Sequence, residues 1–162
     1  CSSSWADAVT IKKIEAIGKK MAPHRKKEIK KIAPIVFKLY KKYNHDPKIV
    51  LALLKVESDI NQKAISKTKD YSMAQINFKV WNKEFKRLNF PAINLKKLKN
   101  DEAYALEVMG KILHILKNRY KGNPYWYSYY HSGTPKFQKA YLKRVQYQFS
   151  KINQEKKNYA KN

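Results

Sequence analysis

Apolar side chains recur every three or four positions along most of the chain, which is the spacing of an amphipathic helix. The clearest patterns cover residues 25–43, 101–120 and 134–158. Pro34 lies inside the first of these, so we expect either a kink or a break into two helices there. A weaker pattern over residues 5–21 predicts an N-terminal leader helix.

The middle of the chain alternates between helical and irregular patterns. Asp46-Pro47 is typical of a helix start, because a capping side chain is followed by proline at the first helical position. Residues 60–76 lose the helical period and predict a loop or small β-hairpin, after which residues 78–88 return to a helix. Residues 91–100 have the composition of a connector. We therefore expect a mostly α fold with one small irregular or β-hairpin segment.

The chain length and composition favour one globular domain. The 162 residues, 43% of them hydrophobic, are enough for a single sizeable core. We expect a tether and leader helix over residues 1–22 and one domain over residues 23–162. A single cysteine excludes an intrachain disulfide framework, and the four histidines lack metal-ligand spacing. Motifs for nucleotide binding are absent, so we expect no cofactor and no metal.

The charge predicts a polyanionic partner. Lys and Arg total 36 against 12 Asp and Glu, giving a net charge of +24. Such a surface attracts an anionic cell wall, an acidic membrane surface or nucleic acid. A basic, tyrosine-rich helical domain could bind nucleic acid through phosphate contacts and base stacking. We disfavour that alternative because the lysines are spread out and arginine, the better phosphate ligand, is rare. We expect a monomer.

The first residues carry a possible localisation signal. Cys1-Ser2-Ser3-Ser4 resembles the start of a mature bacterial lipoprotein, in which a lipidated cysteine follows the cleaved signal peptide. This predicts an exported protein, periplasmic or extracellular, that is anchored to lipid through Cys1. The alternative is that the chain simply starts at an arbitrary position.

Glu57 is the most unusual of the scarce acidic residues. Glu57 lies seven, four and three positions after Val50, Leu53 and Leu54, respectively. All four residues therefore share the most apolar face of their helix. Apolar surroundings penalise the charged form of a carboxyl group. A carboxylic acid that stays protonated near neutral pH can donate a proton to a leaving oxygen. The alternative is a glutamate at a helix end that faces solvent or pairs with a lysine.

Two motifs follow Glu57 in a characteristic order. After Glu57-Ser58 come Asn61, Ala64, Ser66, the segment Asp70-Tyr71-Ser72-Met73-Ala74-Gln75-Ile76-Asn77, and Trp81. Further on come Tyr129-Tyr130-His131-Ser132-Gly133, then Tyr141 and Val145. This ordered set resembles the lysozyme-like lytic transglycosylases over residues 35–147. The first motif is most similar to the subgroup attached to secretion systems, within the superfamily that includes goose-type lysozymes.

Three positions depart from the family pattern. Ser72 replaces the usual glycine, Ala74 the usual methionine, and His131 the usual asparagine. The family glycine lets the backbone approach the sugar closely, so Ser72 predicts a changed loop. His131 can still bond a sugar or a peptide, but it titrates near neutrality. These changes predict an altered glycan, pH range or partner within an unchanged fold.

The resemblance implies a lysozyme-like fold and an enzyme that cuts peptidoglycan strands. The bonds cut would be the β-1,4 bonds between N-acetylmuramic acid and N-acetylglucosamine. Glu57 would protonate the glycosidic oxygen and then, as a carboxylate, take the proton of the muramic 6-hydroxyl, which attacks the anomeric carbon. The product would be a 1,6-anhydro sugar, and no metal or cofactor would be needed.

Asp70 keeps a second enzyme class open. It matches the second carboxylate of chicken-type lysozymes, and a hydrolase normally uses two carboxyl groups. A hydrolytic lysozyme using Glu57 and Asp70, possibly on modified peptidoglycan such as a deacetylated form, is therefore an alternative. Asp70 could equally be a turn residue that bonds its own loop. A basic wall-binding protein without catalysis is a further alternative.

The resemblance also implies a set of substrate-binding residues. Gln75 and Tyr130 would hold sugar hydroxyl or acetamido groups, and Tyr141 would place a hydroxyl near Glu57. Ser58 would orient the Glu57 carboxylate or cap its helix. Met73 and Trp81 would pack on a sugar face, although core packing is an equal alternative for Trp81. The full predicted binding set is Ser58, Ser72, Met73, Gln75, Trp81, Tyr130, His131 and Tyr141.

Overall fold

The computed structural model describes residues 8–153, which are mostly helical with one small hairpin, as the sequence predicts. The elements are α1 (Ile11–Met21), a 3-10 helix (Pro23–Arg25), α2 (Lys26–Tyr43), α3 (Pro47–Ser58), β1 (Asp70–Tyr71), β2 (Ile76–Asn77), α4 (Phe78–Arg87), α5 (Leu95–Asn100), α6 (Glu102–Arg119), a second 3-10 helix (Trp126–Tyr130) and α7 (Pro135–Ile152). The helix α5 falls inside the expected connector.

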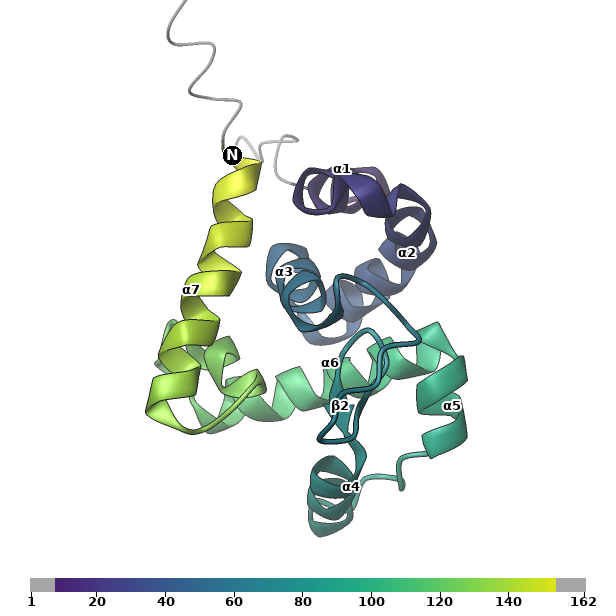
Figure 1. Ribbon diagram of the computed structural model, residues 1–162, viewed down its shortest axis with the longest axis vertical. Helices are drawn as coiled ribbons and strands as arrows, with labels where there is room; N and C mark the ends of the chain where they lie inside the picture. Colours follow the sequence, from purple (N-terminus) through teal and green to yellow (C-terminus); the bar gives the residue numbers. More distant parts are fainter. Residues whose placement is uncertain (1–7, 154–162) are drawn as a thin grey trace, which may run out of the picture.

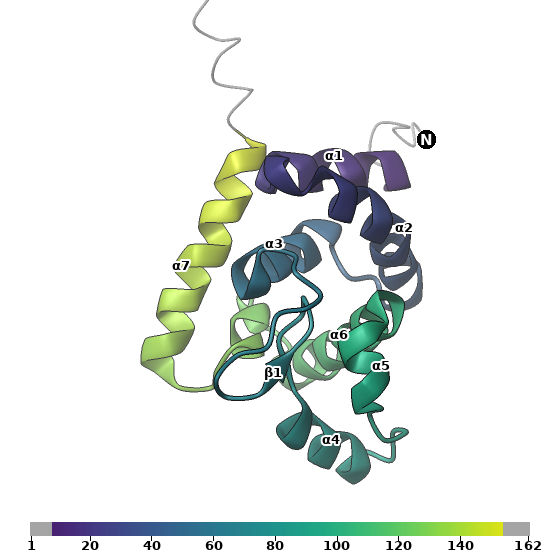
Figure 2. The same ribbon diagram turned by 45° about the vertical axis from the view of Figure 1, so that its right-hand side comes forward.

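Helix α6 is the central element of the core. It crosses the molecule below α3 in Figure 1 and packs against α2, α5 and the second 3-10 helix. Gly110 permits the close approach of α2, because a Cβ atom there would lie 2.6 Å from Leu39 Cδ2 and 3.0 Å from Tyr43 Cε2. Helix α7 runs along one side of the molecule and packs on α3 (Figure 2).

The N-terminal helix belongs to the same core. Helix α1 packs against α2, α3 and α7, and it buries Ile14 and Met21 completely or nearly so. Its Gly18 faces the side chain of Ile29 on α2. The segment predicted as a leader helix is therefore packed on the helices that follow it. The predicted serine tether and the lipid attachment at Cys1 lie outside the described residues.

Helix α2 continues through Pro34, so the expected alternative of a break into two helices is wrong. Proline removes one backbone donor, which leaves the carbonyl oxygen one turn earlier without its helical partner. Pro34 and Lys30 are both exposed, so water can reach that oxygen. Burial of Ile32, Ala33 and Val36 on the opposite face holds the helix in one piece.

Both ends of α3 follow from local sequence. The Asp46 side chain accepts a hydrogen bond from the backbone N–H of Lys48 at 2.9 Å, and Pro47 occupies the first helical position, as predicted. At the other end Asp59 adopts a left-handed backbone with φ of 55°, which stops the helix directly after Glu57-Ser58. Within residues 8–153, no helix has both the length and the apolar content that a membrane span requires.

The close contact at Gly110 predicts a destabilising substitution. Gly110→Val would force side-chain atoms into Leu39 and Tyr43, and overpacking of this kind costs about 1–3 kcal/mol. The control is Asn118→Val, which places the same residue at an exposed position of α6. Chemical denaturation should show a lower free energy of unfolding for Gly110→Val only. Equal losses in both variants would contradict the role given to the contact with α2.

Candidate active site

Glu57 lies in the last turn of α3 with its side chain only 8% exposed. The residues that share its face, Val50, Leu53 and Leu54, are fully buried. This confirms the apolar setting predicted from the helical spacing. An imidazole lies beside Glu57: His131 Nδ1 is 3.5 Å from Glu57 Oε1. That oxygen is buried and makes no hydrogen bond to any described residue.

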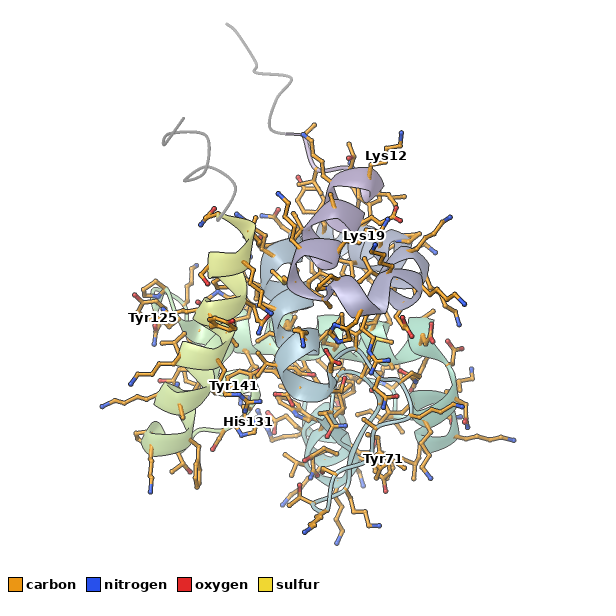
Figure 3. The ribbon with its side chains drawn as sticks, turned by 45° about the horizontal axis from the view of Figure 1, so that its top comes forward. Lys12, Lys19, Tyr71, Tyr125, His131 and Tyr141 are labelled. Atoms are coloured by element: carbon orange, nitrogen blue, oxygen red, sulfur yellow. The ribbon has the colours of Figure 1, made fainter. Side chains whose placement is uncertain are left out.

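Tyr141 completes the group around Glu57. The His131 ring stacks on the Tyr141 ring with centroids 4.9 Å apart and planes 15° apart, and Figure 3 shows the two side chains together beside α7. Burial raises the pKa of the Tyr141 hydroxyl well above its usual range, and the nearby Glu57 charge adds to that shift. The hydroxyl is therefore neutral and available as a donor, and it makes no hydrogen bond within the described chain.

Ser58 and Tyr130 fix the loop that follows β1. Ser58 Oγ donates to the Met73 carbonyl oxygen at 2.7 Å and accepts the Asn61 backbone N–H at 3.1 Å. Tyr130 Oη donates to the neighbouring carbonyl oxygen, that of Ala74, at 2.6 Å. Met73 and Tyr130 are buried, so in this structure both residues support the site. Their predicted contacts with sugar remain predictions.

Ser72 and Gln75 shape the same loop from within. Ser72 has a left-handed backbone with φ of 74°, where the family glycine would be unstrained, and its Oγ accepts the Ala74 N–H at 3.2 Å. Its side chain is buried and bonds the loop rather than facing the surface. Gln75 Nε2 donates to the carbonyl oxygens of Ala64 and Ser72 at 3.1 Å and 3.0 Å. The Gln75 amide group thus holds the loop closed.

Asp70 is held by its own hairpin. Its Oδ2 accepts hydrogen bonds from Ser66 Oγ at 2.8 Å and Thr68 Oγ1 at 2.7 Å. Its Oδ1 accepts one from Asn77 Nδ2, at 3.1 Å, across the strand pair. Because both oxygens are engaged, the geometry favours the turn interpretation over the nucleophile. The Asp70 charge still acts on the site, since it helps to raise the pKa of His131.

Trp81 lines an open aromatic groove next to this group. The groove encloses about 590 Å³ and also contains Val80, Tyr120, Tyr129 and Gly133. Tyr120 and Tyr129 stack with centroids 3.6 Å apart, which gives the groove one rigid wall. Gly133 is two residues after His131, so the chain connects the groove to the residue that contacts Glu57. Trp81 is partly buried and packs against the core while it lines this groove, and its predicted contact with sugar remains a prediction.

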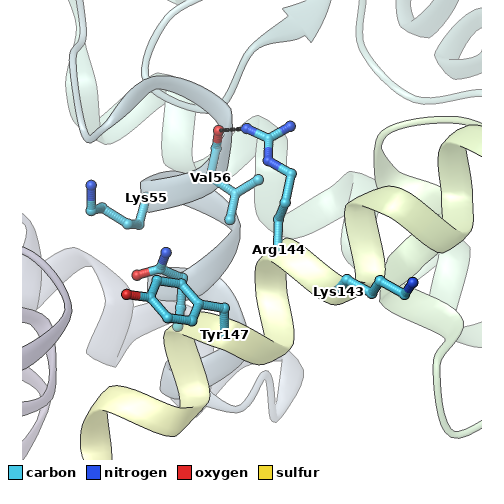
Figure 4. Close-up of a pocket in the computed structure, with 6 residues that line it drawn as sticks. Lys55, Val56, Lys143, Arg144 and Tyr147 are labelled. Carbon is cyan, nitrogen blue, oxygen red and sulfur yellow. Dashed lines mark hydrogen bonds between the residues drawn. The ribbon is translucent and has the colours of Figure 1, made fainter.

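Arg144 is a site residue that the sequence analysis missed. It lies one turn after Tyr141 on α7, and its Nη2 donates to the Val56 carbonyl oxygen at 3.2 Å. Its charge lowers the pKa of His131, opposing Glu57. Figure 4 shows Arg144 in a basic pocket of about 390 Å³, in which Lys143 points away from Lys55. Arg144 lies three positions after Tyr141, and residues at this spacing share a helix face. That spacing was the signal in the sequence that could have identified Arg144.

Within residues 8–153, no group of three His, Cys, Asp or Glu residues could hold a metal ion. The mostly helical fold with one small hairpin, and the buried carboxyl group at the end of α3, agree with a lysozyme-like glycan-cleaving enzyme. A family model for the transglycosylase SLT domain matches residues 34–153, and the chain belongs to this family. A search of curated proteins found no match. The likeness to one subgroup stays a prediction.

The buried Tyr130 hydroxyl predicts a stability effect. Tyr130→Phe would leave the Ala74 carbonyl oxygen without its donor, and an unsatisfied buried acceptor costs about 1–3 kcal/mol. The matched control is Tyr125→Phe, because Tyr125 is 47% exposed. Urea denaturation should show a lower free energy of unfolding for Tyr130→Phe and little change for Tyr125→Phe. A Tyr130→Phe protein as stable as the wild type would contradict the role given to this bond.

Proposed function

We propose that the protein is a lytic transglycosylase that uses Glu57 as its single acid and base. Its substrate is the β-1,4 bond between N-acetylmuramic acid and N-acetylglucosamine, and its product ends in 1,6-anhydromuramic acid. The observation that carries the proposal is the contrast between the two carboxyl groups. The Glu57 side chain is only 8% exposed and its Oε1 makes no hydrogen bond to a described residue, whereas Asp70 is engaged at both oxygens.

The reaction needs one proton to leave Glu57 and one to return. Protonated Glu57 donates to the glycosidic oxygen, the bond from this oxygen to the anomeric carbon breaks, and the N-acetylglucosamine side leaves with a hydroxyl group. The Glu57 carboxylate then accepts the proton of the muramic 6-hydroxyl. The oxygen of that hydroxyl bonds to the anomeric carbon and closes the anhydro ring. The nucleophile comes from the substrate, so a second carboxylate is unnecessary.

The rest of the molecule suits a long anionic substrate. Aromatic side chains in the groove with Trp81 offer flat apolar faces to sugar rings. The net charge of +24 attracts the anionic wall over a distance set by ionic strength. Peptidoglycan lies outside the cytoplasmic membrane, so the proposal includes export to the periplasm or the extracellular space. Lipid anchoring through Cys1 is part of this proposal and concerns a residue outside those described.

Glu57→Gln should abolish cleavage and leave the fold unchanged. Glutamine keeps the shape of the side chain but supplies no proton, and acid–base catalysis is worth roughly 100-fold or more. The control is Glu28→Gln, since Glu28 lies in the first turn of α2 and its side chain is 41% exposed. Digestion of purified peptidoglycan sacculi, with products analysed by mass spectrometry, measures the effect. A Glu57→Gln enzyme that works nearly as fast as the wild type would remove Glu57 from the mechanism.

Asp70→Asn separates transglycosylase from hydrolase. For a transglycosylase we expect a modest loss of rate, and 1,6-anhydro ends in the products. The control is Thr68→Val, which removes one donor to Asp70 but keeps the carboxylate. In a hydrolase Asp70→Asn would cost several orders of magnitude, Thr68→Val much less, and the products would have free reducing ends. That combination would replace the transglycosylase with a lysozyme.

A further inference from the structure

His131 stands in direct contact with the proposed acid. It follows the second 3-10 helix and lies against α7 through its stack on Tyr141. Its Nδ1 is 3.5 Å from Glu57 Oε1, which is an ion-pair distance and slightly long for a hydrogen bond. Catalytic hydrogen bonds are often long before substrate binds and tighten in the complex. The buried Oε1 makes no hydrogen bond within the described chain.

Three charged side chains from three elements act on His131. Glu57 on α3 and Asp70 on β1 favour the protonated imidazolium, while Arg144 on α7 disfavours it. Glu57 is the strongest of these influences, and together they raise the pKa of His131 above its ordinary value in spite of partial burial. The imidazolium form of His131 therefore persists to a higher pH than it would without these neighbours.

We propose that His131 is a positioning residue that pairs with the Glu57 carboxylate and makes catalysis depend on the protonation of two side chains. The proposal rests on the proposed role of Glu57 as acid and base. The stack on Tyr141 fixes the imidazole plane, and the imidazole in turn fixes Oε1 of Glu57. The other Glu57 oxygen can then face the glycosidic bond.

The pair changes the electrostatics of the reaction. When Glu57 gives up its proton, a negative charge forms next to His131, and an imidazolium there stabilises the new carboxylate. The asparagine usual at this position in related sequences can hydrogen-bond but cannot carry a charge. We therefore expect activity to fall in two steps as the pH rises, the upper one caused by deprotonation of His131. A site with asparagine should show only the first.

The first test measures His131 directly and needs no substrate. NMR titration of the histidine ring signals should give a lower pKa for His131 in Glu57→Gln than in the wild type, because the neighbouring negative charge is gone. Arg144→Gln should shift the pKa of His131 in the opposite direction, because a positive charge is gone. His114 is exposed on α6 and should titrate identically in all three proteins. Unchanged titration of His131 in both variants would overturn the pairing.

The second test measures catalysis as a function of pH. His131→Asn should lose the upper step of the profile of kcat/KM on a soluble glycan, while His114→Asn should keep it. A merely structural role would lower activity equally at every pH, and that result, or superimposable profiles, would overturn the proposal. An active Glu57→Gln enzyme would instead refute the proposed function. A His131→Asn enzyme with one step and the wild-type melting temperature would support the positioning role.

Discussion

Two hydrogen bonds to adjacent carbonyl groups hold the loop after β1 against the end of α3 and the second 3-10 helix. Ser58, at the end of α3, donates a hydrogen bond to the carbonyl oxygen of Met73. Tyr130, in the second 3-10 helix, donates one to the carbonyl oxygen of Ala74. These bonds clamp one loop between two segments that are far apart in sequence. The loop cannot move away from Glu57 without leaving a buried carbonyl oxygen unsatisfied, which is costly in a low-dielectric interior.

Acidic residues are scarce in this protein, so the partners of each carboxylate can be compared directly. Carboxylates of the described chain are mostly committed to structure: they pair with cations or cap backbone groups. Glu84 is the clearest case, because Arg87 and Arg119 lower its pKa to about 2. Asp59 pairs with Lys55 and His24 next to the site. Unlike these two carboxylates, Glu57 pairs with an imidazole and with no lysine or arginine of residues 8–153.

Local patterns accounted for the helices and for the setting of Glu57. The helical period places Val50, Leu53, Leu54 and Glu57 on one face of α3, whichever elements the helix packs against, because that geometry is internal to the helix. The cap at Asp46 and the loss of period after Asp59 are equally local. Such patterns were less informative at Pro34, where burial of the opposite face overrides the break that proline favours. They also missed α5, which is too short for a clear period.

The sequence by itself determined that this protein is a mostly helical domain with a carboxyl group on an apolar helix face, since backbone preference and periodicity act over a few residues. Only the tertiary structure decided what surrounds that carboxyl group. His131, Tyr141 and Arg144 meet α3 because the second 3-10 helix and α7 return to it, and no local pattern encodes that return. Tertiary contacts likewise turned Ser72 and Gln75 into loop supports and committed Asp70 to its hairpin, because hydrogen bonds go to whichever partners the fold brings within reach.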